Sequence, residues 1–483
     1  MTLTMLYSLL PILIIAFGCV LSLLLIAWRR SQHLILFFTL AILTSALIAS
    51  LLMQFDVSQA VQVTLLLKVD GYGHFAFILV LLASIAVSLL SSRWLQNSIE
   101  VHDEYFVLLQ LVVLGAGIIV MSDHFGALFL GFELLSIALV GLVGYCKVSQ
   151  YSVESSFKYL ILSATASSFM LLGIAFIYSQ TGVLSFNVIN EQISYGVFYQ
   201  AGLLLFLVGI AFKLSLAPFH FWTPDVYQGS PTPVTLLLAS VSKVAMFVVL
   251  MKCWFSQLAL FAVVPKGAGI FFIMGLLAVL SMLVGNVLAL KQQNVKRLLA
   301  YSSIAHMGYL LIVLMIIAPQ SISLAWQSAL FYLSAYVLAT VSIFMALQLT
   351  QNNDELMGEI NEWQGLFWRS RMLALLIIVA ILSLAGIPLT MGFIGKFYLL
   401  NLAVEAQQWW LIAALIIGSG IGLFYYLRII FVLFLTEKNV NVEQIKWLNN
   451  MSFFHRTTIF VLTFMGVFLG VFPDSLALVL TLL

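Results

Sequence analysis

Charged residues are scarce in this chain of 483 residues. Asp, Glu, Lys and Arg together make up 8% of it, whereas 63% of the residues are hydrophobic. About a quarter of the residues in a soluble domain are charged, so this balance excludes a soluble protein. The mean hydropathy of +1.14 instead indicates a membrane protein with several spans. The net charge of +2, without a basic run, also argues against a nucleic-acid partner.

Cysteine and nucleotide-binding motifs are also nearly absent. The three cysteines are far apart and form no CxxC motif: Cys19, Cys146 and Cys253. This excludes a disulfide framework and argues against an iron–sulfur cluster or another metal site. One glycine-rich stretch, at residues 418–422, follows no predicted strand, so we interpret it as close helix packing rather than a nucleotide loop. The chain therefore has no recognisable site for a redox cofactor.

Long apolar runs fill most of the chain. Polar clusters divide it into fourteen segments of about 20 residues, the length that crosses a bilayer. The predicted spans are 5–28, 33–53, 74–92, 105–121, 125–145, 155–178, 199–221, 232–254, 268–290, 299–318, 323–349, 372–402, 408–434 and 455–480. The loops between them are short. The sequence therefore predicts an all-α polytopic membrane protein with a single membrane domain, 1–483.

The distribution of basic residues gives the expected orientation. Loops after odd-numbered spans, with their margins, carry 14 Lys and Arg residues, and loops after even-numbered spans carry 3. Basic residues favour the cytoplasmic side of a membrane. We therefore expect both termini on the outer side.

Two of the predicted spans are interrupted. The seventh contains Ala217-Pro218, and the twelfth contains Gly386-Ile387-Pro388. Proline frees backbone groups, and a broken helix is tolerated in a membrane only against protein or a water-lined cavity. Because the breaks lie five spans apart, we predict two five-helix repeats, 105–254 and 268–434. An odd number of helices places such repeats in opposite orientations.

Three lysines fall inside predicted spans: Lys213 just before the first break, Lys243 in the eighth span, and Lys396 after the second break. A charged side chain inside a bilayer is costly, and by default it indicates an ion or proton pathway. The alternative for Lys243 and Lys396 is snorkelling from a span margin. Lys243 lies far from both ends of its span, which disfavours this alternative, whereas Lys396 follows a break.

Glu133 is the carboxylate set most deeply in an apolar run, LFLGFELL. It could be a structural partner for a buried lysine, or a gate whose changing distance from Lys213 loads and unloads a proton. His220 lies seven residues after Lys213 and could be either a satisfied core group or a proton carrier. Asp225 and Tyr227 follow in TPDVY, which predicts a turn with a structural role.

Other ionisable residues lie near the ends of predicted spans. Surface anchoring is the leading interpretation for this group: Glu104, Glu154, Lys158, Lys296 and Arg297.

Several motifs resemble the antiporter-like subunits of respiratory complex I. The longest are FKLSLAPFHFWTPDVYQG at 212–229 and NVKRLLAYSSIAHMGY at 294–309. Shorter ones are KY at 158–159, followed by ILSA at 161–164, and SLAGIP at 383–388, followed by GFIGKFY at 392–398. The resemblance covers nearly the whole chain. Within the family, Lys396 differs from the glutamate of the M-type sibling, and the chain lacks the long lateral helix of the L-type sibling.

The resemblance implies roles for individual residues. They form a proton relay: Glu133 and Lys213 as a gate pair, His220 on a water-linked axis, Lys243 as the central carrier, and Lys396 as the carrier toward the outer side. Four further positions match residues with supporting roles: Glu104, Lys158, Lys296 and Tyr301.

The family also implies an activity and a setting. The chain would be a non-redox, proton-translocating subunit of NADH:quinone oxidoreductase in a bacterial inner membrane, with both termini periplasmic. NADH, flavin, iron–sulfur clusters and quinone (ubiquinone) would be bound by partner subunits. The expected neighbours are a sibling antiporter-like subunit, the small membrane subunits toward the quinone site, and the lipid bilayer. A stand-alone monovalent cation/proton antiporter is the alternative function. A purely structural scaffold is disfavoured by its costly buried charges.

Overall fold

The structure is a computed structural model. It describes residues 3–54, 60–96, 103–146, 149–186, 196–257, 267–316, 321–350, 358–436 and 453–483. These residues are predominantly helical, so the predicted all-α class is confirmed. The chain divides into two compact units, residues 1–273 with Leu483 and residues 274–482. The two predicted inverted repeats stay a prediction.

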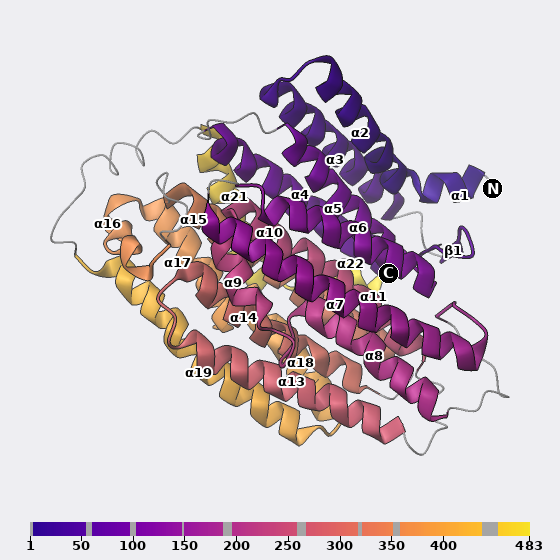
Figure 1. Ribbon diagram of the computed structural model, residues 1–483. Helices are drawn as coiled ribbons and strands as arrows, with labels where there is room; N and C mark the ends of the chain where they lie inside the picture. The colour runs from indigo at the N-terminus through magenta and orange to yellow at the C-terminus, as the bar shows by residue number, and fades with distance from the viewer. Residues whose placement is uncertain are drawn as a thin grey trace. The chain divides into compact units, whose positions relative to one another are not determined.

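The first unit is built from long apolar helices (Figure 1). Helices α7 and α8 run side by side, and α5 packs along α6. A short antiparallel β-pair precedes α4. The elements are α1 (Leu3–Ser8), α2 (Leu10–Trp28), α3 (Gln32–Gln54), β1 (Val61–Gln62), β2 (Lys68–Val69), α4 (Gly71–Gln96), α5 (Glu104–Val120), α6 (Phe125–Val143), α7 (Gln150–Thr181), α8 (Val197–Leu214), α9 (Trp222–Gly229), α10 (Thr232–Ala239), α11 (Val241–Ser256) and the first residues of α13 (Gly267–Ala289).

The second unit continues with α13. The 3₁₀ segment η1 directly extends α14, and α15 packs against both α17 and α18. The elements are α14 (Val295–Leu310), η1 (Leu311–Met315), α15 (Ile322–Thr350), η3 (Ile360–Trp363), α16 (Leu366–Arg369), α17 (Arg371–Ala385), α18 (Met391–Glu405), α19 (Trp409–Phe434), α21 (Phe453–Val471) and α22 (Asp474–Thr481).

Burial identifies the centre of each unit. The apolar window in Thr232–Ser256, which holds α10 and α11, is 100% buried in the first unit. The windows in α14–η1 and in α15 are each 94% buried in the second unit. Most other spans bury a smaller share, because one face of each remains available to lipid. Polar side chains on the enclosed helices must therefore find partners inside the protein.

Eleven helices in the described part of the chain are long and apolar enough to cross a membrane, or twelve if the bent pair α21–α22 forms one span. Two more apolar helices, α5 and α17, are shorter. Helix α17 is short because the predicted span 372–402 is divided between α17 and α18. A multi-spanning membrane protein is confirmed, and the total of fourteen spans stays a prediction.

The predicted eighth span is confirmed as one apolar stretch of 25 residues, Thr232–Ser256. A one-residue interruption at Ser240 divides it, because α10 ends at Ala239 and α11 begins at Val241. The Ser240 hydroxyl donates to the Leu236 carbonyl at 2.6 Å, a contact that bends helices. The turn expected at residues 223–227 is instead part of α9, where Pro224 lies in the first turn and proline is tolerated.

Candidate functional site

The first helix break begins earlier than its proline suggests. Helix α8 ends at Leu214, four residues before Pro218. Ser215 adopts a left-handed conformation, with φ of 62°. The Leu216 N–H donates to the Ala211 carbonyl at 2.8 Å, the bond that closes a Schellman motif. The sequence therefore ends the helix with a defined cap, and the proline only prevents it from continuing.

Lys213 lies in the last turn of α8, directly before this cap, and is 1% exposed. Its Nζ donates to Ser136 Oγ on α6 at 2.7 Å and to Tyr159 OH on α7 at 2.6 Å. The same Nζ lies 4.9 Å from the ring centroid of Phe132 and 5.1 Å from that of Tyr159. Hydrogen bonds and cation–π contacts thus compensate for the loss of water around this amine.

Glu133 is half-buried on α6 and close enough to interact electrostatically with Lys213. Among the described residues, however, no ion pair joins the two side chains. The predicted gate pair is therefore separated in this structure, with the lysine held by hydroxyl groups.

The break also buries polar atoms. Ser215 Oγ and Thr223 Oγ1 are enclosed without a hydrogen-bond partner among the described residues. His220 is 5% exposed, with its ring stacked 4.6 Å from that of Phe221. Buried polar groups of this kind are usually satisfied by internal water. The break therefore offers hydrogen-bonding positions for water next to Lys213.

Lys243 lies in the first turn of α11, just after the unpredicted interruption at Ser240, and is 0% exposed. Its Nζ lies 5.7 Å from the ring centroid of Tyr227 on α9. A snorkelling lysine keeps its ammonium at a surface, whereas Lys243 is buried. Snorkelling of Lys243 from a span margin is therefore wrong.

The second break has the same kind of cap. Helix α17 ends at Ala385, followed by Gly386 with φ of 79°. The Ile387 N–H donates to the Leu382 carbonyl at 3.1 Å, again closing a Schellman motif. Lys396, on α18, is 8% exposed, and its Nζ donates to the Ala385 carbonyl at 2.8 Å. It is therefore buried at the break rather than snorkelling.

The two breaks place their lysines alike despite the different sequence order. Lys213 precedes its proline and Lys396 follows its own, yet each lies at the C-terminal end of a half-helix. Lys213 is in the last turn of α8, and Lys396 reaches back to the last carbonyl of α17. Helix C-termini carry partial negative charge, which stabilises an ammonium.

His306, to which the sequence assigned no role, lies at the centre of a polar network in the second unit. His306 Nδ1 is 2.6 Å from Tyr332 OH, and its Nε2 is 3.1 Å from Tyr426 OH. Tyr426 OH also hydrogen-bonds Ser302. His306 lines a small cavity with residues of α15, α17 and α18. Ser302 and His306 are four residues apart on α14 and so share one face of the helix. This spacing was the one feature of the sequence that could have indicated the network.

Two of the supporting residues make ion pairs near the surface. Glu104 pairs with Arg30 at 3.2 Å, and both side chains are about half exposed. Lys158 pairs with Glu154 at 2.7 Å and with Asp225 at 2.9 Å, which ties α7 to α9. Exposed pairs contribute little stability, so the Glu104 pair is a weak contact.

The other two supporting residues lie on α14. Lys296 is 2% exposed, so its interpretation as a surface anchor is wrong. Lys296 is buried because other helices enclose α14. The spacing of residues in the sequence does not reveal this enclosure. Tyr301 is half-buried.

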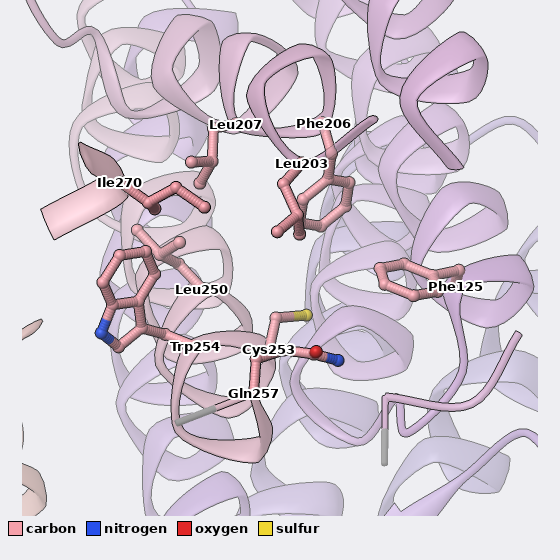
Figure 2. Close-up of a pocket in the computed structure, with 9 residues that line it drawn as sticks. All are labelled: Phe125, Leu203, Phe206, Leu207, Leu250, Cys253, Trp254, Gln257 and Ile270. Atoms are coloured by element: carbon pink, nitrogen blue, oxygen red, sulfur yellow. The ribbon is translucent and has the colours of Figure 1, made fainter. Parts of the chain in front are cut away.

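A separate small cavity lies in the first unit, and none of the buried lysines lines it (Figure 2). Its polar member, Gln257, accepts from Tyr199 OH at 2.6 Å and donates to the Phe186 carbonyl at 2.7 Å. Apolar side chains form most of the lining: Phe125, Leu203, Phe206, Leu207, Leu250, Cys253, Trp254 and Ile270. We assign it no part in the lysine site.

The chain has membrane-spanning helices that are interrupted at capped breaks, and a buried lysine lies at each break. It is therefore a multi-spanning membrane protein with broken helices. Residues 122–422 match the model of the NADH:quinone oxidoreductase/Mrp antiporter transmembrane family. The chain therefore belongs to this family, and the resemblance found in the sequence is confirmed.

Solved structures agree with this assignment. A chain of respiratory complex I from Thermus thermophilus, solved with bound aureothin, is 30% identical, with 97% of this chain and 98% of that chain covered and a TM-score of 0.82. Two others share the fold. A chain of the archaeal membrane-bound sulfane sulfur reductase is 22% identical, covers 99% and 96%, and has a TM-score of 0.86. A chain of the Mrp complex from Dietzia sp. DQ12-45-1b is 18% identical, covers 100% and 97%, and has a TM-score of 0.84.

Proposed function

We propose that this chain is a proton-translocating subunit of NADH:quinone oxidoreductase, at the position of the N-type antiporter-like subunit. The observation that carries the proposal is the burial of three lysines, Lys213, Lys243 and Lys396, each at or beside a helix interruption. A charge inside a membrane protein is retained where function requires it. Lys396, rather than the glutamate of the M-type sibling, supports the N-type position.

The proposed relay has three steps. A change at the interface with a partner subunit alters the separation of Glu133 and Lys213. The Lys213 ammonium then gives its proton to the neutral amine of Lys243, which becomes the ammonium. Lys396 releases a proton toward the outer side, and the proton held by the Lys243 ammonium replaces it. The unpartnered hydroxyls and His220 at the first break support water-linked transfer there.

The work must come from outside the chain. Moving one charge against the membrane potential requires roughly 2.3 kcal/mol per 100 mV. In this proposal quinone reduction in partner subunits supplies it, and those subunits hold NADH, flavin, iron–sulfur clusters and quinone. The partners are membrane subunits of the same complex, including a sibling antiporter-like subunit and small subunits toward the quinone site. The proposed location is a bacterial inner membrane, with both termini periplasmic.

A stand-alone monovalent cation/proton antiporter is the second candidate, because the family model also covers the Mrp antiporters. The 30% identity with the complex I chain over nearly the full length favours the redox-driven complex.

Deleting the gene separates the two candidates. We expect membranes of the deletion strain to lose NADH-dependent quinone reduction and proton pumping, and the intact gene supplied in trans to restore both. Growth of the same strain in raised Na⁺ or K⁺ is the second readout. Salt-sensitive growth with normal NADH-dependent respiration would instead identify the antiporter.

A further inference from the structure

The side chain of Lys213 is held by two hydroxyl groups. Its Nζ donates to Ser136 Oγ at 2.7 Å and to Tyr159 OH at 2.6 Å. The Ser136 hydroxyl donates its own proton to the Phe132 carbonyl at 2.7 Å, so its lone pairs are available to Lys213. A hydroxyl both accepts and donates hydrogen bonds. The pair can therefore hold an ammonium through two acceptors, or a neutral amine to which the phenol donates.

The carboxylate partner lies one helical turn away on the same helix. Glu133 and Ser136 are three residues apart on α6, so they share a face and differ by about 4.5 Å along its axis. The lysine stem is four flexible methylenes long. Lys213 can therefore reach the Glu133 carboxylate or the Ser136 hydroxyl without movement of α6.

Tyr159 is fixed by both sides of the helix break. Its ring is fully buried, 5.0 Å from that of Trp222 on α9 and 6.5 Å from that of Phe212 on α8. Trp222 Nε1 donates to the Phe212 carbonyl at 2.9 Å, across the break. The neighbouring Lys158 is paired with Asp225 on α9. A movement of α9 would therefore be transmitted to the phenol that holds Lys213.

We propose that Ser136 and Tyr159 are positioning residues that form a second resting site for the Lys213 side chain, alternative to Glu133. The inference rests on the proposed function, in which Lys213 carries a proton. A carboxylate favours the charged ammonium, whereas hydroxyls hold the charged and neutral forms alike. When the Lys213 side chain moves from Glu133 to the hydroxyl site, its ammonium therefore loses the carboxylate as a counter-charge. There it gives one proton to the Lys243 amine and remains as a neutral amine.

The test removes each hydroxyl in the intact complex in membrane vesicles and measures protons pumped per NADH oxidised. Ser136→Ala and Tyr159→Phe are each expected to lower this ratio, and the double variant to lower it further. A net hydrogen bond of about 1 kcal/mol corresponds to a roughly 5-fold change in the population of the hydroxyl site. Ser136→Thr keeps the hydroxyl and should restore coupling. Tyr199→Phe, which removes a buried phenol bonded to Gln257 away from the lysines, is the matched control.

The outcomes distinguish this inference from the proposed function. Loss of coupling in Ser136→Ala and Tyr159→Phe, with recovery in Ser136→Thr, supports the second resting site. Wild-type coupling in both hydroxyl variants overturns it, and the proposed function survives if Lys213→Ala still abolishes pumping. An equal loss of coupling in Ser136→Ala and Ser136→Thr also overturns it, because the loss would then reflect side-chain packing and not the hydroxyl group. The two single variants act at different helices, so either one tests the site if the other fails to assemble.

Discussion

Replacing Gly392 with alanine should sharply lower the amount of assembled complex. Gly392 lies in the first turn of α18, against the last turn of α17. A Cβ atom at this position would lie 1.8 Å from the Ser383 backbone carbonyl oxygen, which cannot rotate away. Its N–H also donates to Ser383 Oγ at 3.1 Å. The half-helices would have to separate, at a cost of about 3 kcal/mol or more. Native gel electrophoresis of solubilised membranes measures the assembled fraction.

Gly420 supplies the matched control. It lies inside α19, and an added Cβ would meet none of the described residues within 4 Å. Gly420→Ala should therefore leave assembly unchanged or raise stability by up to about 1 kcal/mol, through helix propensity. Normal assembly of Gly392→Ala would contradict the close packing of the second break.

Replacing Lys243 with methionine should leave assembly intact while proton pumping falls to background. Lys243 is 0% exposed, and methionine keeps much of the packing of the lysine stem while removing the cost of burying a charge. A positioned proton carrier, by contrast, contributes on the order of 100-fold or more to a transfer rate. Pumping should therefore fall while the amount of assembled complex stays unchanged. Fluorescence quenching of a pH-sensitive dye in vesicles, normalised to complex content, measures the pumping.

An exposed lysine provides the comparison for this variant. Lys291→Met removes a charge from the surface after α13 and should leave both pumping and assembly at wild-type levels. If Lys243→Met pumps as well as Lys291→Met, Lys243 is not a carrier.

The sequence predicted those features that depend on local composition. Apolar runs located the helices, and the charges within them identified Lys213, Lys243 and Lys396, all of which the structure buries. Pro218 and Pro388 located both interruptions. The exact end of α8 was missed because the cap at Ser215, not the proline, terminates the helix.

Features that depend on contacts between distant segments were not predictable. Ser136 and Tyr159 are 77 and 54 residues from Lys213 in sequence, and only packing brings them to its Nζ. The same holds for the tyrosines around His306. The interruption at Ser240 has neither glycine nor proline, so its signal was only a pair of serines in an apolar run.

The most direct test of the central claim is Lys213→Ala in the otherwise intact complex, with NADH oxidation and the proton gradient recorded together in membrane vesicles. If buried lysines at helix breaks carry protons, the complex should assemble, and both signals should fall, the gradient at least as much as the oxidation. Unchanged oxidation and an unchanged gradient would contradict the relay and leave Lys213 with a structural role at most.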